Sequence, residues 1–254
     1  MATSSGSASA QTRVLLRAAV ERSRRTSGPQ FPIDFVRSQQ DPPERPPLAR
    51  LLSGGQGGEV RLKLYLTLTM LATKAPYDIR EKVPSSLYAE MLGLPDPMGN
   101  GARRVADALD WLAAKKLISL GRRKGLPSTV KLLDARGGGG PYVPVKKRWI
   151  VVPVELWTQQ WIVALSGSEL AIWLVLREVT GGVHTPQTIA TERRAQYGLS
   201  MDTWTRAGQA LEARGLVALG ETRERRQFEL PRTRRTYWLD VERLEKPPGG
   251  RTHE

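Results

Sequence analysis

The sequence contains no cysteine and only two histidines in 254 residues. The lack of cysteine excludes disulfide bonds, thiolate metal sites and a cysteine nucleophile. No apolar run approaches the roughly 18 residues that a membrane-spanning helix needs. The glycine-rich stretch at 54–58 (GGQGG) lacks the Lys-Ser/Thr of a phosphate-binding loop, and no nucleophile elbow occurs. We therefore expect a non-enzymatic protein without metal or cofactor.

Positive charge is what the chain has in excess. It holds 39 basic and 25 acidic residues, a formal net charge of +14. Such an excess favours a polyanionic partner, because each neutralised phosphate releases a counterion. The basic residues are mostly arginine, which forms bidentate hydrogen bonds with phosphate and guanine. A GC-rich genome that favours arginine codons is the alternative explanation, so the position of the charge matters more than its total.

Stretches rich in proline and glycine divide the chain. Residues 41–48 (DPPERPPL) are typical of a polyproline-type spacer, and residues 136–144 (RGGGGPYVP) cannot lie inside a core element. We predict five segments: a disordered basic N-terminal arm (1–57), a first domain (58–135), a basic Gly/Pro-rich linker (136–148), a second domain (149–245) and a disordered tail (246–254).

The N-terminal arm allows more than one interpretation. Residues 12–25 have the pattern of a basic amphipathic helix. The Arg- and Ser-rich, acid-poor start also resembles an organelle transit peptide. We prefer the basic arm of a DNA-binding protein, because such arms are common there. That interpretation implies a cytoplasmic protein at a bacterial nucleoid or plasmid.

The two predicted domains resemble each other. The segment ALDWLAAKKLISLG at 108–121 matches AGQALEARGLVALG at 207–220, without gaps, at six of fourteen positions. Each match is surrounded by the same pattern of apolar periodicity, breaks and caps. The expected helices are 59–74, 84–92, 100–116, 169–179 (capped by Ser168), 185–197 and 201–214 (capped by Ser200). The expected strands are 117–120, 129–133, 216–219 and 236–239.

Helix, helix, tight turn, helix and hairpin is the order of a winged-helix domain. We predict an α+β fold, mainly α with small β-hairpins, made of two winged helix-turn-helix domains in tandem. This architecture resembles plasmid replication initiators, which implies binding to repeated origin sites, with one domain often serving dimerisation. Transcriptional repressors use the same parts, so replication, partition and transcription stay open. The predicted partner is double-stranded DNA, with a homodimer possible.

A third class with this architecture consists of acidic tandem winged-helix subunits of chromosome-condensing complexes, which bind protein. The net charge of +14 argues against that class. A protein-interaction subunit of a chromosome or plasmid maintenance complex therefore stays as the alternative function.

The exposed face of the third helix is the predicted reader of bases, because helix-turn-helix proteins place this face in the major groove. In helix 201–214 it carries Thr205, Arg206 and Gln209. Arginine pairs with guanine and glutamine with adenine through bidentate hydrogen bonds. An ordinary solvated helix face is the alternative interpretation.

The first domain offers a different face. Arg103 is its predicted base contact, but Asp107 and Asp110 lie on the same face. Carboxylates there would repel phosphates, so we predict that the first domain is the poorer reader.

The hairpins, or wings, concentrate the charge of the second domain. Residues 149–245 hold twelve basic and twelve acidic residues, whereas 223–235 alone hold six arginines against two glutamates. Wings of such proteins meet phosphates or the minor groove. The predicted backbone and wing contacts are Arg104, Arg122, Arg123, Lys124, Lys146, Lys147, Arg148, Arg223, Arg225, Arg226, Arg232, Arg234 and Arg235.

Three tryptophans open the second domain: Trp157, Trp161 and Trp173. Aromatic rings stack on unpaired bases in single-strand binders. Their helical spacing instead favours burial in the core or between the domains, and we predict that role.

Overall fold

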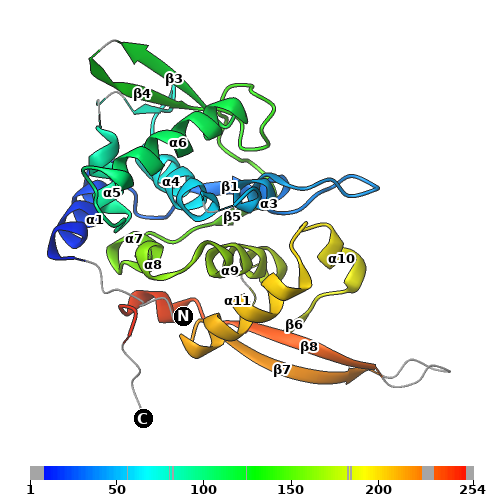
Figure 1. Cartoon of the computed structure of the whole chain (residues 1–254). Helices are drawn as coiled ribbons and strands as arrows, with labels where there is room; N and C mark the ends of the chain where they lie inside the picture. Colours follow the sequence, from blue (N-terminus) through cyan, green and yellow to red (C-terminus); the bar gives the residue numbers. More distant parts are fainter. Residues whose placement is uncertain are drawn as a thin grey trace.

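The computed structural model of the chain describes residues 9–55, 57–79, 81, 83–123, 125–181, 183, 185–224 and 232–249. Within these residues the chain forms eleven α-helices and three small antiparallel sheets (Figure 1). The predicted α+β class is confirmed at this level. In the described part no helix combines the length and apolar character that crossing a membrane requires.

The elements fall into two successive series. The first comprises α1 (Ala10–Ser23), β1 (Gln30–Pro32), α2 (Ile33–Val36), α3 (Pro47–Leu52), α4 (Gly58–Leu71), β2 (Asp78–Ile79), α5 (Ser85–Met91), α6 (Asn100–Ala114), β3 (Ile118–Arg123) and β4 (Leu126–Leu132). The second comprises β5 (Trp149–Val151), α7 (Glu155–Thr158), α8 (Trp161–Ala164), α9 (Gly167–Thr180), β6 (Gln187–Thr188), α10 (Thr191–Ala195), α11 (Met201–Ala213), β7 (Val217–Glu224), β8 (Arg232–Leu239) and the 3₁₀ helix η1 (Glu242–Glu245).

The two series repeat one topology. A core helix (α4 or α9) is followed by a short strand, a short helix, a long helix and a hairpin. The strand order is β2-β4-β3 in one sheet and β6-β8-β7 in the other, so the last strand is central in both. The registers also correspond, since Gly121 faces Thr129 in one hairpin and Gly220 faces Thr236 in the other. The internal similarity seen in the sequence therefore reflects a structural repeat.

The repeat begins earlier than the sequence suggested. A strand and two short helices precede each core helix: β1, α2 and α3 before α4, and β5, α7 and α8 before α9. The sequences FPIDFV at 31–36 and VPVELW at 152–157 correspond there. β1 and β5 pair with each other in antiparallel register, with Phe31 opposite Ile150. Each series thus contributes one strand to a sheet that joins the two.

The turns before the long helices make reciprocal contacts across the molecule. Gly93, before α6, lies against Val163 of α8, and Gly198, before α11, lies against Ala49 of α3. Both glycines have positive φ, 64° and 62°, a conformation that a side chain disfavours. Because each turn packs on the other series, the two series are related by an approximate twofold arrangement.

The prediction of a disordered arm over residues 1–57 is wrong for the described residues 9–55 and 57. α1, β1, α2 and α3 all lie in this stretch, and most of its apolar side chains are buried in the common core. The fully buried ones are Leu16, Phe31, Phe35, Val36 and Leu51. The proline-rich segment 41–48 is a short connection that leads into α3, with Pro47 at the first helical position, where proline is favoured. The buried apolar residues therefore make this region part of the folded core, in spite of its proline content.

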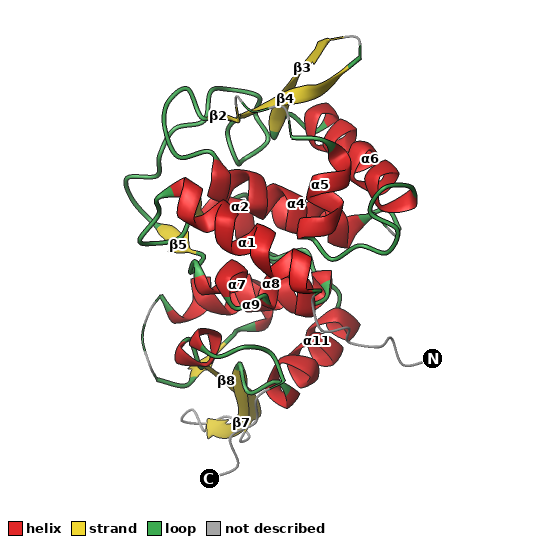
Figure 2. Cartoon of the chain, turned by 90° about the vertical axis from the view of Figure 1, so that its left-hand side faces the viewer, coloured by secondary structure: helices red, strands yellow, loops and turns green. Residues whose placement is uncertain are grey.

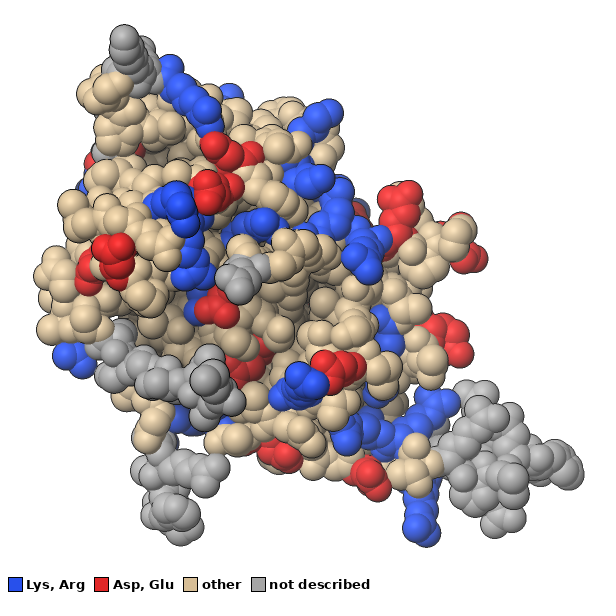
Figure 3. Space-filling model, in the orientation of Figure 1, with Lys and Arg blue, Asp and Glu red and all other residues tan. Residues whose placement is uncertain are grey.

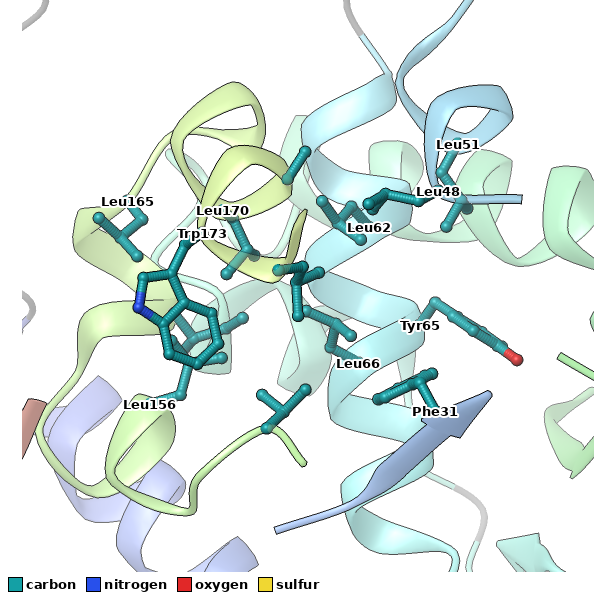
Figure 4. Packing of buried hydrophobic residues seen from close by; sticks show 14 of the residues in the cluster. Phe31, Leu48, Leu51, Leu62, Tyr65, Leu66, Leu156, Leu165, Leu170 and Trp173 are labelled. Atoms are coloured by element: carbon teal, nitrogen blue, oxygen red, sulfur yellow. The ribbon is translucent and has the colours of Figure 1, made fainter. Parts of the chain in front are cut away.

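The core is continuous between the two series. Its centre is formed by α4 and α9, which are buried on nearly all sides, as expected of helices that are apolar all round. Figure 4 shows Leu62 and Leu66 of α4 beside Leu170 of α9, with Trp173 farther along α9. The prediction that Trp157, Trp161 and Trp173 pack inside is confirmed, since all three are fully buried.

Two details of the second series differ from the sequence prediction. α9 is capped by Ser166 instead of Ser168, because the Ser166 hydroxyl accepts the Glu169 amide while the Glu169 carboxylate accepts the Ser166 amide. This reciprocal pair is a capping box. The helix expected over 185–197 is reduced to α10, and residues 187–188 form β6 instead, which pairs with β8.

The predicted linker and tail are partly anchored. Leu133 bridges to Pro141, and the Tyr142 ring lies 4.7 Å from that of Tyr77. At the C-terminal end, the carbonyl of Lys246 accepts a hydrogen bond of 2.9 Å from the Trp161 indole. Residues 250–254 of the predicted tail lie outside the described residues.

A buried lysine joins the two series at their interface. Lys63 of α4 is 3% exposed; its Nζ lies 2.7 Å from Glu59 Oε1 and donates to the carbonyl of Val163 at 3.1 Å. The other oxygen of Glu59 accepts the amide of Gly167, at the start of α9. Burial lowers the pKa of Lys63, and the charge of Glu59 opposes that shift. Glu59 thus compensates a buried cation and an unpaired helix amide at once.

We expect Glu59→Ala to lower the free energy of unfolding by about 2 kcal/mol, because it leaves Lys63 charged and buried without its partner. Lys63→Met removes the charge and keeps the volume, so we expect a smaller loss, or none, although it leaves one carbonyl unpaired. Urea unfolding of both variants measures the difference. A Lys63→Met variant less stable than Glu59→Ala would contradict this account.

Candidate nucleic-acid interface

The two long helices α6 and α11 lie on the same side of the molecule. Both face the viewer in Figure 1, and after the quarter turn of Figure 2 both lie along the right-hand side, opposite β5. The hairpins β3–β4 and β7–β8 lie at the two far ends (Figure 1). One face therefore carries both helices that were predicted to read bases.

α11 presents an exposed polar face to this side. Ser200 caps the helix, as predicted, and Trp204 and Leu211 are buried beneath it. On the opposite face the Arg206 side chain is 81% exposed, and its Nε lies 2.8 Å from Asp202 Oδ1. An exposed ion pair of this i,i+4 type contributes only about 0.3–0.5 kcal/mol, so a nucleic acid can replace the carboxylate as the partner of Arg206.

The other predicted base contacts of α11 lie close by. Gln209 is exposed and Thr205 is half-buried, each within one helical turn of Arg206. Among the described residues Gln209 has no hydrogen-bond partner, so its amide is available to a ligand. The structure thus brings these three candidates together on one surface.

α6 has a different distribution of charge from that expected. Arg103 is exposed and donates to Asn100 Oδ1 at 3.2 Å. Asp110 forms an ion pair with Arg122 of β3, both more than half exposed. Arg122 of the wing therefore compensates one of the two α6 carboxylates that were expected to repel phosphate. Of these two, only Asp107 forms no ion pair with a described residue. One of the two reasons for predicting that this helix reads bases less well than helix 201–214 therefore no longer applies.

The second wing carries basic residues along its described part. Arg223 is exposed, while Arg234 and Arg235 are half-buried; in the ladder Arg235 stands opposite Glu221 and Arg234 opposite Thr222. Lys124, Arg225 and Arg226 lie outside the described residues, and only the backbone of Arg123 and Arg232 is described.

Lys147 and Arg148, two basic residues at the end of the predicted linker, do not join this surface. The carbonyl of Arg148 accepts a hydrogen bond from Ile33, directly before β5. β5 lies on the side opposite α6 and α11 (Figure 2). Lys147 and Arg148 therefore belong to another part of the surface than the reading helices.

A groove of about 730 Å³ lies between α11 and the turn that precedes α6. Arg206 and Ala210 of α11 and its C-cap residue Arg214 line one wall, and Gly93 and Pro95, from the turn before α6, line the other. Arg214 Nε also lies 2.8 Å from Glu169 Oε1, so α11 is tied to the start of α9 at this groove.

Sequence reasoning missed several basic residues on this face. Figure 3 shows a run of basic side chains down its upper right and a second group at the β7–β8 hairpin. Only the second group was expected. The basic residues that the sequence analysis did not name lie before and within α3, at the start of α4 and directly after α6: Arg45, Arg50, Arg61, Lys115 and Lys116. The surplus of basic residues in 58–148, seventeen against eight acidic, is a signal for those at α4 and α6, whereas those at α3 lie outside this range.

The site offers binding groups and no cluster of metal ligands. Within the described residues no group of three or more His, Asp or Glu side chains could hold a metal ion. Neither a scan against protein-family models nor a search of curated proteins finds a match for this chain. What the protein binds is therefore inferred from the geometry and charge of this surface.

Proposed function

We propose that this protein binds double-stranded DNA sequence-specifically, with two winged-helix units in one chain. In each unit the third helix, α6 or α11, enters the major groove and the hairpin that follows contacts the phosphate backbone. Support for the winged-helix assignment comes from the repeated element order and from the strand orders β2-β4-β3 and β6-β8-β7.

The observation that carries the proposal is the shared face of α6 and α11 (Figures 1 and 2). Two reading helices on one side can enter two major grooves of one duplex only where both grooves face the protein. This condition recurs every helical turn, about 10 bp. One chain is thereby suited to a site with two short elements spaced by about one turn, in an origin or an operator.

The experiment is selection of binding sites from a random duplex pool, followed by affinity titration of the enriched duplex. We expect two elements about one helical turn apart, and binding at least 10³-fold tighter than to random duplexes. Absence of duplex binding at about 50 mM salt would overturn the proposal and favour the protein-interaction alternative. Equal affinity for all duplexes would overturn sequence specificity.

Single substitutions on the reading helices test their roles. Gln209→Ala and Arg206→Ala are each expected to cost about 1–3 kcal/mol on the preferred duplex and much less on random DNA. Because Asp110 is engaged by Arg122, we expect Arg103→Ala to cost an amount in the same range. Titrations on both duplexes measure these differences, and a loss that is equal on both duplexes would contradict base reading by that residue.

A further inference from the structure

We infer that a strip of basic residues between the two reading helices is a third DNA-contacting surface, which holds the phosphodiester backbone between the two major-groove contacts. This inference deepens the proposed function and depends on it. The strip, called the central strip below, consists of Arg45, Arg50, Arg61, Lys115 and Lys116.

Contacts within the structure make the central strip one continuous surface. Arg61 Cζ lies 4.7 Å from the centre of the Trp111 ring, and Lys115 Nζ lies 5.8 Å from it. Arg61 donates to the carbonyl of Ser53, and Arg45 donates to the hydroxyl of the same serine.

Gly137 extends the strip to its other members. An added Cβ there would lie 3.0 Å from Arg50 Nη2 and 3.4 Å from the carbonyl oxygen of Lys115, and the neighbouring Gly139 lies against Lys116. An added Cβ on Gly54 or Gly57 would likewise lie within 4 Å of Arg61, so glycines from both stretches border the central strip.

The strip runs from one reading unit to the other. Lys115 and Lys116 directly follow the C-terminal end of α6. At the other end the Arg45 side chain lies 3.3 Å from the position of an added Cβ on Gly198, in the turn that leads into α11. A duplex that engages both α6 and α11 therefore passes over the central strip.

The positive charges of the central strip are not compensated by carboxylates of the described residues. In the part of the chain that the structure describes, none of the five forms an ion pair with a carboxylate, whereas Arg206 and Arg122 do. Arg61 and Arg50 are held by single hydrogen bonds to the carbonyls of Ser53 and Arg136. A guanidinium has five N–H donors, so most remain available. Ordered arginines with free donors suit bidentate phosphate contacts.

The strip is separate from the surfaces already assigned to bases. It has no glutamine or asparagine, and its residues lie before and within α3, at the start of α4 and directly after α6 rather than in the middle of a reading helix. Phosphate contacts position a protein on DNA without reading its sequence. The central strip is therefore expected to add affinity on every duplex and to leave discrimination unchanged.

The test is the double variant Lys115→Glu/Lys116→Glu, since both side chains are exposed and neither forms a hydrogen bond within the described part of the chain. Its matched control is Arg13→Glu/Arg17→Glu on α1, with the same change of charge on two exposed residues away from the strip. On the preferred and on a random duplex we expect the strip variant to bind on the order of tenfold more weakly. We also expect the magnitude of its slope of log affinity against log salt to fall by about two, because each lost phosphate contact lowers this magnitude by about 0.9. The control should keep its slope.

Hydroxyl-radical footprinting separates this inference from the proposed function. The native protein should protect the backbone between the two major-groove elements, and the strip variant should lose that protection while it keeps the outer ones. A strip variant with an unchanged salt slope and footprint would overturn the inference and leave the proposed function standing. A native protein that binds no duplex would overturn the proposed function itself. Equal losses in the strip variant and the control would also overturn the inference, because net charge alone would then explain them.

Discussion

Deletion of residues 1–57 is expected to abolish the cooperative unfolding transition of the protein. The deleted stretch supplies fully buried side chains to the common core, among them Leu16, Phe31 and Phe35. Burial of each such side chain is worth about 1.5–3 kcal/mol, and a whole domain is typically stable by only about 5–15 kcal/mol. The deletion also removes β1, the partner strand of β5. Thermal unfolding followed by circular dichroism measures the loss.

The control is deletion of residues 1–8, which leaves every helix and strand of the described part in place and should unfold at the temperature of the full chain. A point substitution tests the same packing without truncation. A Cβ added at Gly28 would lie 1.4 Å from the carbonyl oxygen of Val152, so Gly28→Ala forces a shift of the backbone and should lower the melting temperature. Retention of a sharp transition by the 1–57 deletion would show that these contacts are dispensable.

Most of the helices and hairpin strands between residues 58 and 239 could be predicted from the sequence, because the patterns that specify them are local. Apolar periodicity, the Ser200 cap and the similarity between 108–121 and 207–220 each act within a few turns of chain. The segment 30–52 has no such signal, since α2 and α3 are short and surrounded by prolines. Its place is decided by contacts with distant residues, such as the pairing of Phe31 with Ile150. Only the match between 31–36 and 152–157 could have indicated it.

The candidate interface was predictable to a similar degree. Thr205, Arg206 and Gln209 share one face because helical spacing fixes it. The ion pairs that change the availability of charge, Arg122 with Asp110 above all, join different elements and leave no mark in the sequence. The central strip likewise arises only when α3, α4 and α6 meet, and the glycines that border it are typical of linkers when they are considered alone.

Glu178→Ala is expected to have the largest effect of any single substitution on the second reading unit. The Glu178 side chain is 3% exposed, and its carboxylate lies 2.9 Å from Arg193 Nη2 and 3.4 Å from Arg37 Nη2. It also accepts a hydrogen bond of 2.5 Å from the hydroxyl of Tyr197. Removal of the carboxylate leaves two arginines without their charge partner, one of them largely buried. Breaking a buried pair in this way costs about 3–5 kcal/mol.

This loss should fall first on α10, because that helix has no buried residue of its own and is held to α9 through Arg193 and Tyr197. Since α10 leads directly into the turn before α11, DNA affinity should fall together with the amide protection of residues 191–197 in hydrogen exchange.

Burial raises the pKa of Tyr197, and the hydrogen bond to Glu178 adds to that shift, so the hydroxyl stays a neutral donor at neutral pH. Tyr197→Phe is the matched control: it removes the hydrogen bonds that the hydroxyl donates to Glu178 and accepts from Arg193 Nε. Both arginines keep the carboxylate as their charge partner, so this variant should cost less stability than Glu178→Ala. If Glu178→Ala leaves the protection of α10 and the affinity for DNA unchanged, the carboxylate is not what positions this helix. The contacts of Arg194 with Trp204 and Tyr237 would then be sufficient to hold it.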